Sequence, residues 1–237
     1  MNRHYLRTAA GCLAGGAALA AAGYAALAGG AYLRYGHAAR ARSDDGQDPL
    51  LDRFMPLYDI VERHHVRVEA PADMTLAAAR DLNLDDSCVV RAIFKGRELM
   101  FASEPSAPVD TTLIRAALQI GWGILADRDG REVVLGAVTR PWEPNPVFRD
   151  LVPREFITFA EPGYVKIAWT LRADPIDQQT SIFRSETRAM ATDVEARVKF
   201  RRYWALVSPG VALIRRAMLA PVRLEAERRA VELLSAT

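Results

Sequence analysis

Few residues of this chain have the types and spacing that catalysis or metal binding requires. His64 and His65 are adjacent on a predicted strand, so their side chains point to opposite faces and cannot ligate one metal ion together. Cys88 begins a predicted helix, but no obvious base accompanies it. No nucleophile elbow, P-loop or dinucleotide fingerprint is present in the sequence. The sequence therefore predicts no catalytic residue, no metal site and no cofactor.

Aromatic side chains with a few hydroxyl groups among them are the best candidates for a binding pocket. Phe183, Ser185 and Thr187 alternate along one predicted strand and therefore share a face. Such a mixture is typical of small-molecule pockets, and it is also typical of a plain hydrophobic core. The predicted ligand-binding residues are Trp122, Trp142, Trp169, Phe183, Ser185, Thr187 and Trp204.

Strands in the second half of the chain must position most of these side chains. Residues 122–126 and 132–139 form a predicted β-hairpin around a polar turn. Residues 164–172 and 180–191 follow as strands with regular alternation of apolar and polar side chains. This pattern predicts an antiparallel sheet that is buried on one face.

The opposite face of this sheet is expected to be charged. Arg184, Glu186 and Arg188 alternate with the inward-facing residues of the last strand. Cross-strand ion pairs with Lys166 or Arg172 would account for these charges without a functional role.

Helices are expected before and after this sheet. Residues 57–70 form a first predicted strand, and helices follow over residues 72–80 and 85–94. Asp110 is the predicted N-cap of a short helix that extends through Leu118.

A long helical region closes the chain. Asp193 is its predicted N-cap, and Phe200 and Trp204 lie on its apolar stripe. Ser208-Pro209 is expected to end this helix and start another, which Pro221 interrupts. The predicted fold class is α+β, with an antiparallel sheet wrapped against the long C-terminal helix.

The order of these elements resembles the helix-grip fold of the START-like, or SRPBCC, superfamily over residues 51–207. Arg140-Pro141-Trp142, after a glycine-containing strand, is similar to a motif of uncharacterised bacterial members. The segments that carry the resemblance are residues 57–70, 72–80, 121–125, 132–136, 164–169, 182–188 and 193–204. Residues 208–237, a basic helical tail, lie outside it.

Members of this superfamily enclose an elongated cavity between the sheet and the C-terminal helix. Many bind lipids, sterols or polyketides there, and some catalyse cyclisation or hydration. The resemblance implies a binding protein for a hydrophobic small molecule or lipid, with a cyclase- or hydratase-type enzyme and a non-binding membrane scaffold as alternatives. The superfamily shares no catalytic residue, so none is implied here. An inward-facing carboxylate or histidine with a strongly shifted pKa would favour the enzyme.

Residues 8–33 form a run of twenty-six residues without a charged side chain. At about 1.5 Å per residue, a helix of this length would exceed the roughly 30 Å hydrocarbon core of a bilayer. The sequence predicts a single-pass transmembrane anchor in the cell membrane, between a basic flank (residues 1–7) and a linker (residues 34–50). A cleaved signal peptide is the alternative. Arginines on both sides leave the side of the membrane undetermined.

The two ends of the chain also suggest partners. Gly11 and Gly15 have a spacing that lets two helices pack closely as a homodimer, and that also arises by chance in an Ala- and Gly-rich run. Residues 196–229 carry mostly basic charges, which could contact anionic lipid or form a solvated helix face. No nucleic-acid-reading motif accompanies them, so no nucleic-acid partner is predicted. The expected partners are the membrane and a lipid or other apolar small molecule.

Overall fold

The computed structural model describes residues 22–30, 32–33, 48–83 and 112–235 of the 237-residue chain. Of the predicted anchor, residues 22–30 and 32–33 are helical. The rest of the anchor with Gly11 and Gly15, most of the linker, and the helix predicted over residues 85–94 with Cys88 lie outside the described residues.

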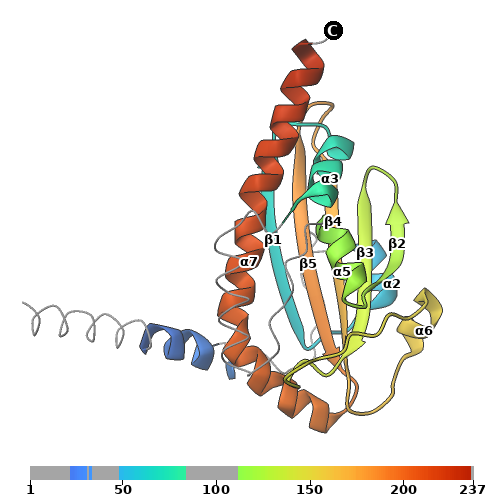
Figure 1. The fold of residues 1–237 in the computed structure, drawn as a ribbon, viewed down its shortest axis with the longest axis vertical. Helices are drawn as coiled ribbons and strands as arrows, with labels where there is room; N and C mark the ends of the chain where they lie inside the picture. Colours follow the sequence, from blue (N-terminus) through green and yellow to red (C-terminus); the bar gives the residue numbers. More distant parts are fainter. Residues whose placement is uncertain (1–21, 31, 34–47, 84–111, 236–237) are drawn as a thin grey trace, which may run out of the picture.

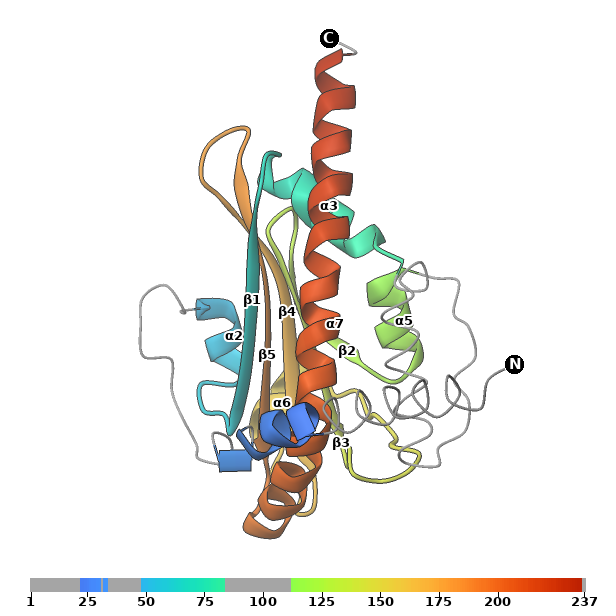
Figure 2. The ribbon, with the colours of Figure 1, turned by 90° about the vertical axis from the view of Figure 1, so that its left-hand side faces the viewer.

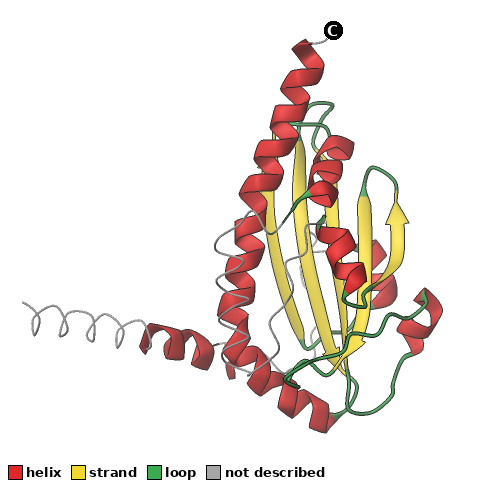
Figure 3. Cartoon of the chain, viewed as in Figure 1, coloured by secondary structure: helices red, strands yellow, loops and turns green. Residues whose placement is uncertain are grey.

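A five-stranded antiparallel sheet forms the centre of the fold (Figures 1 and 3). Its strands are β1 (Ile60–Val68), β2 (Gly123–Arg128), β3 (Glu132–Thr139), β4 (Val165–Pro175) and β5 (Ser181–Ala191). The strand order is β1-β5-β4-β3-β2, so the first strand pairs with the last. The predicted α+β class, with an antiparallel sheet and a long C-terminal helix, is confirmed.

Helices cover both faces of the sheet (Figure 2). They are α2 (Pro49–Phe54), α3 (Ala72–Asp81), α5 (Leu113–Gln119), α6 (Pro153–Thr158) and α7 (Val194–Ser235). We call the face under α3, α5 and α7 the inner face, and the face under α2 and α6 the outer face. The N-cap of α5 is Thr112, whose backbone is extended and forms a β-bridge with Asn83. The predicted N-cap, Asp110, lies outside the described residues.

The prediction that the sheet is buried on one face only is wrong. Every residue of β3 is buried. On the outer face, Val134 and Val138 share a hydrophobic cluster with Phe54 of α2 and Phe156 of α6. Helices α2 and α6 have only six residues each, which is too short to leave a clear period in the sequence.

Helix α7 is continuous over 42 residues, with both prolines inside it. The breaks predicted at Ser208-Pro209 and Pro221 are therefore wrong. The predicted N-cap is confirmed, because Asp193 Oδ1 accepts a hydrogen bond from the amide of Ala196 at 2.8 Å. Buried side chains come from before, between and after the prolines: Ala196, Phe200, Trp204, Ala205, Ser208, Met218, Val222 and Ala226. Packing along this whole stripe outweighs the local penalty of proline, about 3 kcal/mol in a helix interior.

One of the described helices, α7, has the length and composition to cross a membrane. Its residues Met218, Val222 and Ala226 belong to the same hydrophobic cluster as residues of α3 and of four of the five strands. These three side chains therefore pack in the core of the domain, whereas most of the apolar part of α7 is not buried.

Candidate functional site

The predicted pocket residues lie on the inner face of the sheet. Phe183, Ser185 and Thr187 occupy every second position along β5 and are buried. The indole Nε1 of Trp169 donates a hydrogen bond to Ser185 Oγ at 2.9 Å, and Trp169 is opposite Thr187 in the register. The shared face predicted for these residues of β5 is confirmed.

The four tryptophans form two groups on this face. Trp122 lies edge-on to Trp169, with ring centroids 6.3 Å apart, and stacks on Phe148 at 5.7 Å. Trp142 and Trp204 pack in a separate hydrophobic cluster with the start of α7. The structure therefore brings Trp122 and Trp169 to the β5 residues and places the other two tryptophans apart from them.

Three further polar residues face the same region, and none of them is among the ligand-binding residues that the sequence predicts. His64 of β1 is opposite Ser185 in the register, and Glu62 is two residues earlier on the same side of the strand. His64 Nε2 lies 3.7 Å from Glu62 Oε2. From α7, the guanidinium carbon of Arg215 lies 4.2 Å from the ring centroid of Trp169, which is a cation–π contact. We call Glu62, His64, Ser185, Thr187 and Arg215 the inner-face polar group.

Burial sets the charges of this group. Burial lowers the pKa of His64, Glu62 opposes this shift, and Arg216 and Arg215 add to it. His64 is therefore neutral at pH 7. Burial also lowers the pKa of Arg215, to about 10, with Glu62 opposing the shift, so the guanidinium stays charged at neutral pH. The inner face thus holds the guanidinium of Arg215 and the carboxyl group of Glu62 beside a neutral imidazole.

Two buried polar atoms in this group, His64 Nε2 and Thr187 Oγ1, have no hydrogen-bond partner among the residues that the structure describes. Buried polar atoms nearly always bond to protein, ordered water or a ligand. Together with the guanidinium of Arg215, they supply hydrogen-bonding atoms and one positive charge beside aromatic rings. This arrangement can hold the polar or anionic end of a molecule whose apolar part lies against those rings.

The described residues also line two hollows elsewhere in the molecule. One, of about 390 Å³, lies between α3 and the second half of α7, and the other, of about 330 Å³, lies beside Arg172 of the outer face. None of the predicted ligand-binding residues lines either hollow. Within the described ranges, no three His, Cys, Asp or Glu side chains are grouped in a way that could hold a metal ion.

Gly121 positions Trp122 and the ring stacked on it. Its φ is +98°, and a Cβ there would lie 2.2 Å from the backbone carbonyl oxygen of Phe148. Gly121→Ala should therefore lower the free energy of unfolding by about 2–4 kcal/mol, measured by urea denaturation. Gly130→Ala is the matched control, with φ +67° and its nearest contact at 3.3 Å from Asp73 Cβ; it should lose only about 1 kcal/mol. Equal losses would show that the Phe148 carbonyl moves aside freely.

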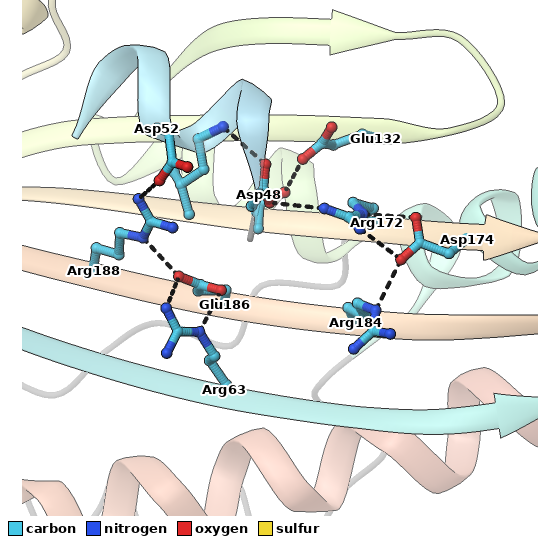
Figure 4. A network of polar contacts seen from close by, with 11 residues as sticks. Asp48, Asp52, Arg63, Glu132, Arg172, Asp174, Arg184, Glu186 and Arg188 are labelled. Carbon is cyan, nitrogen blue, oxygen red and sulfur yellow. Dashed lines mark hydrogen bonds and ion pairs between the residues drawn. The ribbon is translucent and has the colours of Figure 1, made fainter. Parts of the chain in front are cut away.

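A network of ion pairs fills the outer face of the sheet beneath α2 (Figure 4). Glu186 accepts hydrogen bonds from Arg63 Nε at 2.8 Å and from Arg188 Nε at 2.6 Å. Arg188 also donates to Asp52 and, at 2.8 Å, to the carbonyl oxygen of Met55. The network therefore ties β1 and β5 to α2.

A second part of this network links β4 and β5. Asp174 accepts hydrogen bonds from Arg172 Nε at 2.7 Å and from Arg184 Nε at 2.8 Å. The pairing predicted for the outer charges is wrong, because Lys166 instead donates to the carbonyl oxygen of Ile157 and Arg172 binds Asp174. The partners come from β1, α2 and the end of β4, and the sequence does not indicate the positions of β1 and α2 beside β5.

Glu132 and Asp48 form a buried carboxyl pair at the edge of this network (Figure 4). Burial raises the pKa of Glu132 to about 8, and the neighbouring Asp48 adds to this shift, whereas Thr170 and Arg172 oppose it. Because Glu132 lies on the outer face, it does not face the inner-face polar group. Its shifted pKa therefore gives no support to acid–base catalysis at that group.

No protein-family model matches this sequence, and no curated protein matches it. Among solved structures, a hypothetical protein from Helicobacter pylori is 8% identical, with 79% of this chain and 99% of that chain covered and a TM-score of 0.37. A norcoclaurine synthase from Thalictrum flavum is 13% identical, with 72% and 96% covered and a TM-score of 0.32. The Zhui aromatase/cyclase from Streptomyces sp. R1128 is 19% identical, with 72% and 94% covered and a TM-score of 0.25. Likenesses this low carry no argument about the site or its ligand.

Proposed function

We propose that this protein is a membrane-anchored binding protein of the SRPBCC type, which holds a hydrophobic small molecule or lipid between the inner face of the sheet and α7. Residues 8–33 would supply the anchor. The inner-face polar group supports the proposal most directly. Within it, the buried atoms His64 Nε2 and Thr187 Oγ1 have no hydrogen-bond partner among the described residues, and the charged Arg215 lies on the same face. A bound molecule would supply the missing hydrogen bonds.

The charge of Arg215 indicates the chemistry of the ligand's polar end. A guanidinium binds carboxylate and phosphate groups with charge-assisted hydrogen bonds. The rings of Trp122, Trp169 and Phe183 offer apolar surface nearby. We therefore expect an amphipathic ligand with an acidic head, such as a long-chain carboxylic acid or a phospholipid.

Native mass spectrometry of the full chain, extracted in mild detergent, tests this site. A small molecule or lipid is expected to co-purify with the wild type. Arg215→Gln should retain at least about tenfold less of it, because a hydrogen bond to a charged group contributes about 1.5–3 kcal/mol. Arg202→Gln removes an exposed charge from the same helix and is the matched control. Equal retention by the two variants, or a wild type without any bound molecule, would contradict the proposed site.

A cyclase- or hydratase-type enzyme is the second candidate, and one observation favours it. His64 faces the inner region, has its pKa lowered by burial and lies 3.7 Å from the carboxylate of Glu62. A neutral imidazole near a carboxylate can act as a general base. Conversion of the bound molecule during incubation of the wild type, seen as a change in its mass, would favour catalysis over binding alone.

A further inference from the structure

The side of α7 that faces away from the sheet carries an exposed apolar stripe. Leu213, Leu224 and Val231 are 51%, 60% and 65% exposed. Their spacings of eleven and seven residues place them on one side of the helix. Ala220 is exposed on the same side. A soluble domain normally buries such a stripe against another element or a partner.

Positive charges flank this stripe on one side. Arg216 and Arg223 are exposed, and none of the ion pairs found between described residues involves them. By contrast, Arg228 and Arg229 are both paired with Glu225. The stripe and the two arginines together form an amphipathic surface that complements an anionic lipid layer.

The N-terminal helical segment points away from this same side of α7. Arg201 Nε donates to the carbonyl oxygen of Tyr32 at 2.7 Å, and the Tyr24 hydroxyl donates to the carbonyl oxygen of Leu206. Figure 1 shows residues 22–30 from the side, directed away from the sheet, and Figure 2 shows them nearly end-on in front of α7. A membrane helix that continues in this direction would place the bilayer against the outer side of α7.

We propose that α7 lies flat on an anionic bilayer, with Leu213, Leu224 and Val231 in the interfacial zone and Arg216 and Arg223 at the head groups. The inference rests on the membrane anchoring included in the proposed function. Helix α7 then has two partners along its length: the sheet on its buried stripe and lipid on its exposed stripe. The domain is held in one orientation at the membrane surface instead of moving freely on its anchor.

Cysteine accessibility in the full chain tests this orientation. Leu213→Cys and Leu224→Cys are made in a Cys12→Ser/Cys88→Ser background, with Ile157→Cys on α6 as the control because Ile157 is 48% exposed. Each protein is incorporated into vesicles of phosphatidylcholine with phosphatidylglycerol and reacted with a membrane-impermeant maleimide. In these vesicles, the two α7 positions should react at least about fivefold more slowly than the control. In detergent at high dilution, all three positions should react at similar rates. Adding Arg216→Gln and Arg223→Gln should restore most of the reactivity.

The outcomes separate this inference from the anchor itself. Co-flotation with vesicles together with equal reactivity at all three positions would overturn the flat orientation and leave the anchor intact. Failure to co-float would overturn both. Protection that is equally strong in detergent and rises with protein concentration would also overturn the inference, because a second copy of the chain would then cover the stripe.

Discussion

Replacing Arg188 by alanine is expected to lower the free energy of unfolding by about 3–5 kcal/mol. The Arg188 side chain is 0% exposed and is paired with Glu186 and Asp52. Its guanidinium carbon lies 4.9 Å from the ring centroid of Tyr58. Truncation would leave the buried Glu186 with Arg63 as its remaining ion-pair partner among the described residues. It would also open a cavity beneath α2.

Arg184→Ala is the matched control for this variant, since Arg184 lies two residues earlier on the same strand and on the same outer face. Its side chain is 31% exposed and is paired with Asp174. Because solvent screens an ion pair of this kind, the expected loss is no more than about 1 kcal/mol. Urea denaturation of the two variants and the wild type measures the difference. Similar losses would mean that the burial of Arg188 does not determine its effect.

The outer and inner faces of the sheet should respond to mutation in different ways. On the outer face, each charged side chain labelled in Figure 4 is paired with another, and α2 and its N-cap Asp48 supply two of the acids, although Arg188 Nη2 has no hydrogen-bond partner among the described residues. A change there should act on stability. On the inner face, His64 Nε2 and Thr187 Oγ1 have no hydrogen-bond partner among the described residues, so a change at the inner-face polar group should act on ligand retention. The Arg188 and Arg215 variants therefore report on the two faces through two different measurements.

Local alternation was sufficient to predict the strands and the inner residues of β5. Phe183, Ser185 and Thr187 share a face because successive side chains of a strand alternate, whatever the strand pairs with. The pairing of β1 with β5 joins residues far apart in the sequence, and no local pattern specifies it. For this reason the sequence does not predict that Glu62 and His64 lie beside Ser185 and Thr187.

Helix α7 shows how packing overrides a local rule. The proline penalty predicts breaks at Ser208-Pro209 and Pro221, and it is correct for an isolated helix. Met218 and Val222, which follow the first proline, nevertheless pack against the sheet and α3. This packing stabilises the helical conformation beyond the proline. Arg215 lies between the two prolines, so the expected break assigned it to a tail outside the domain and removed it from the candidate site.

Glu132→Gln is expected to flatten the pH dependence of stability and to be more stable than the wild type at high pH. With its pKa raised to about 8 in the folded protein, Glu132 keeps a proton that the unfolded chain loses near the ordinary value of 4.5. The stability that this proton contributes is complete below about pH 4.5 and is lost as the pH rises to about 8, at about 1.4 kcal/mol per pH unit. Glutamine has no such proton to lose, so the difference between variant and wild type should grow across this range.

Urea denaturation in steps from about pH 5 to about pH 9 measures this difference. Glu155→Gln, at an exposed carboxylate on α6, is the control and should follow the wild type. If Glu132→Gln followed the control instead, Glu132 would be charged in the folded protein. Arg172, whose Nη1 lies 3.8 Å from Asp48 Oδ2, would then have to neutralise both acids of the carboxyl pair, and the outer face would be held together by charge rather than by a retained proton.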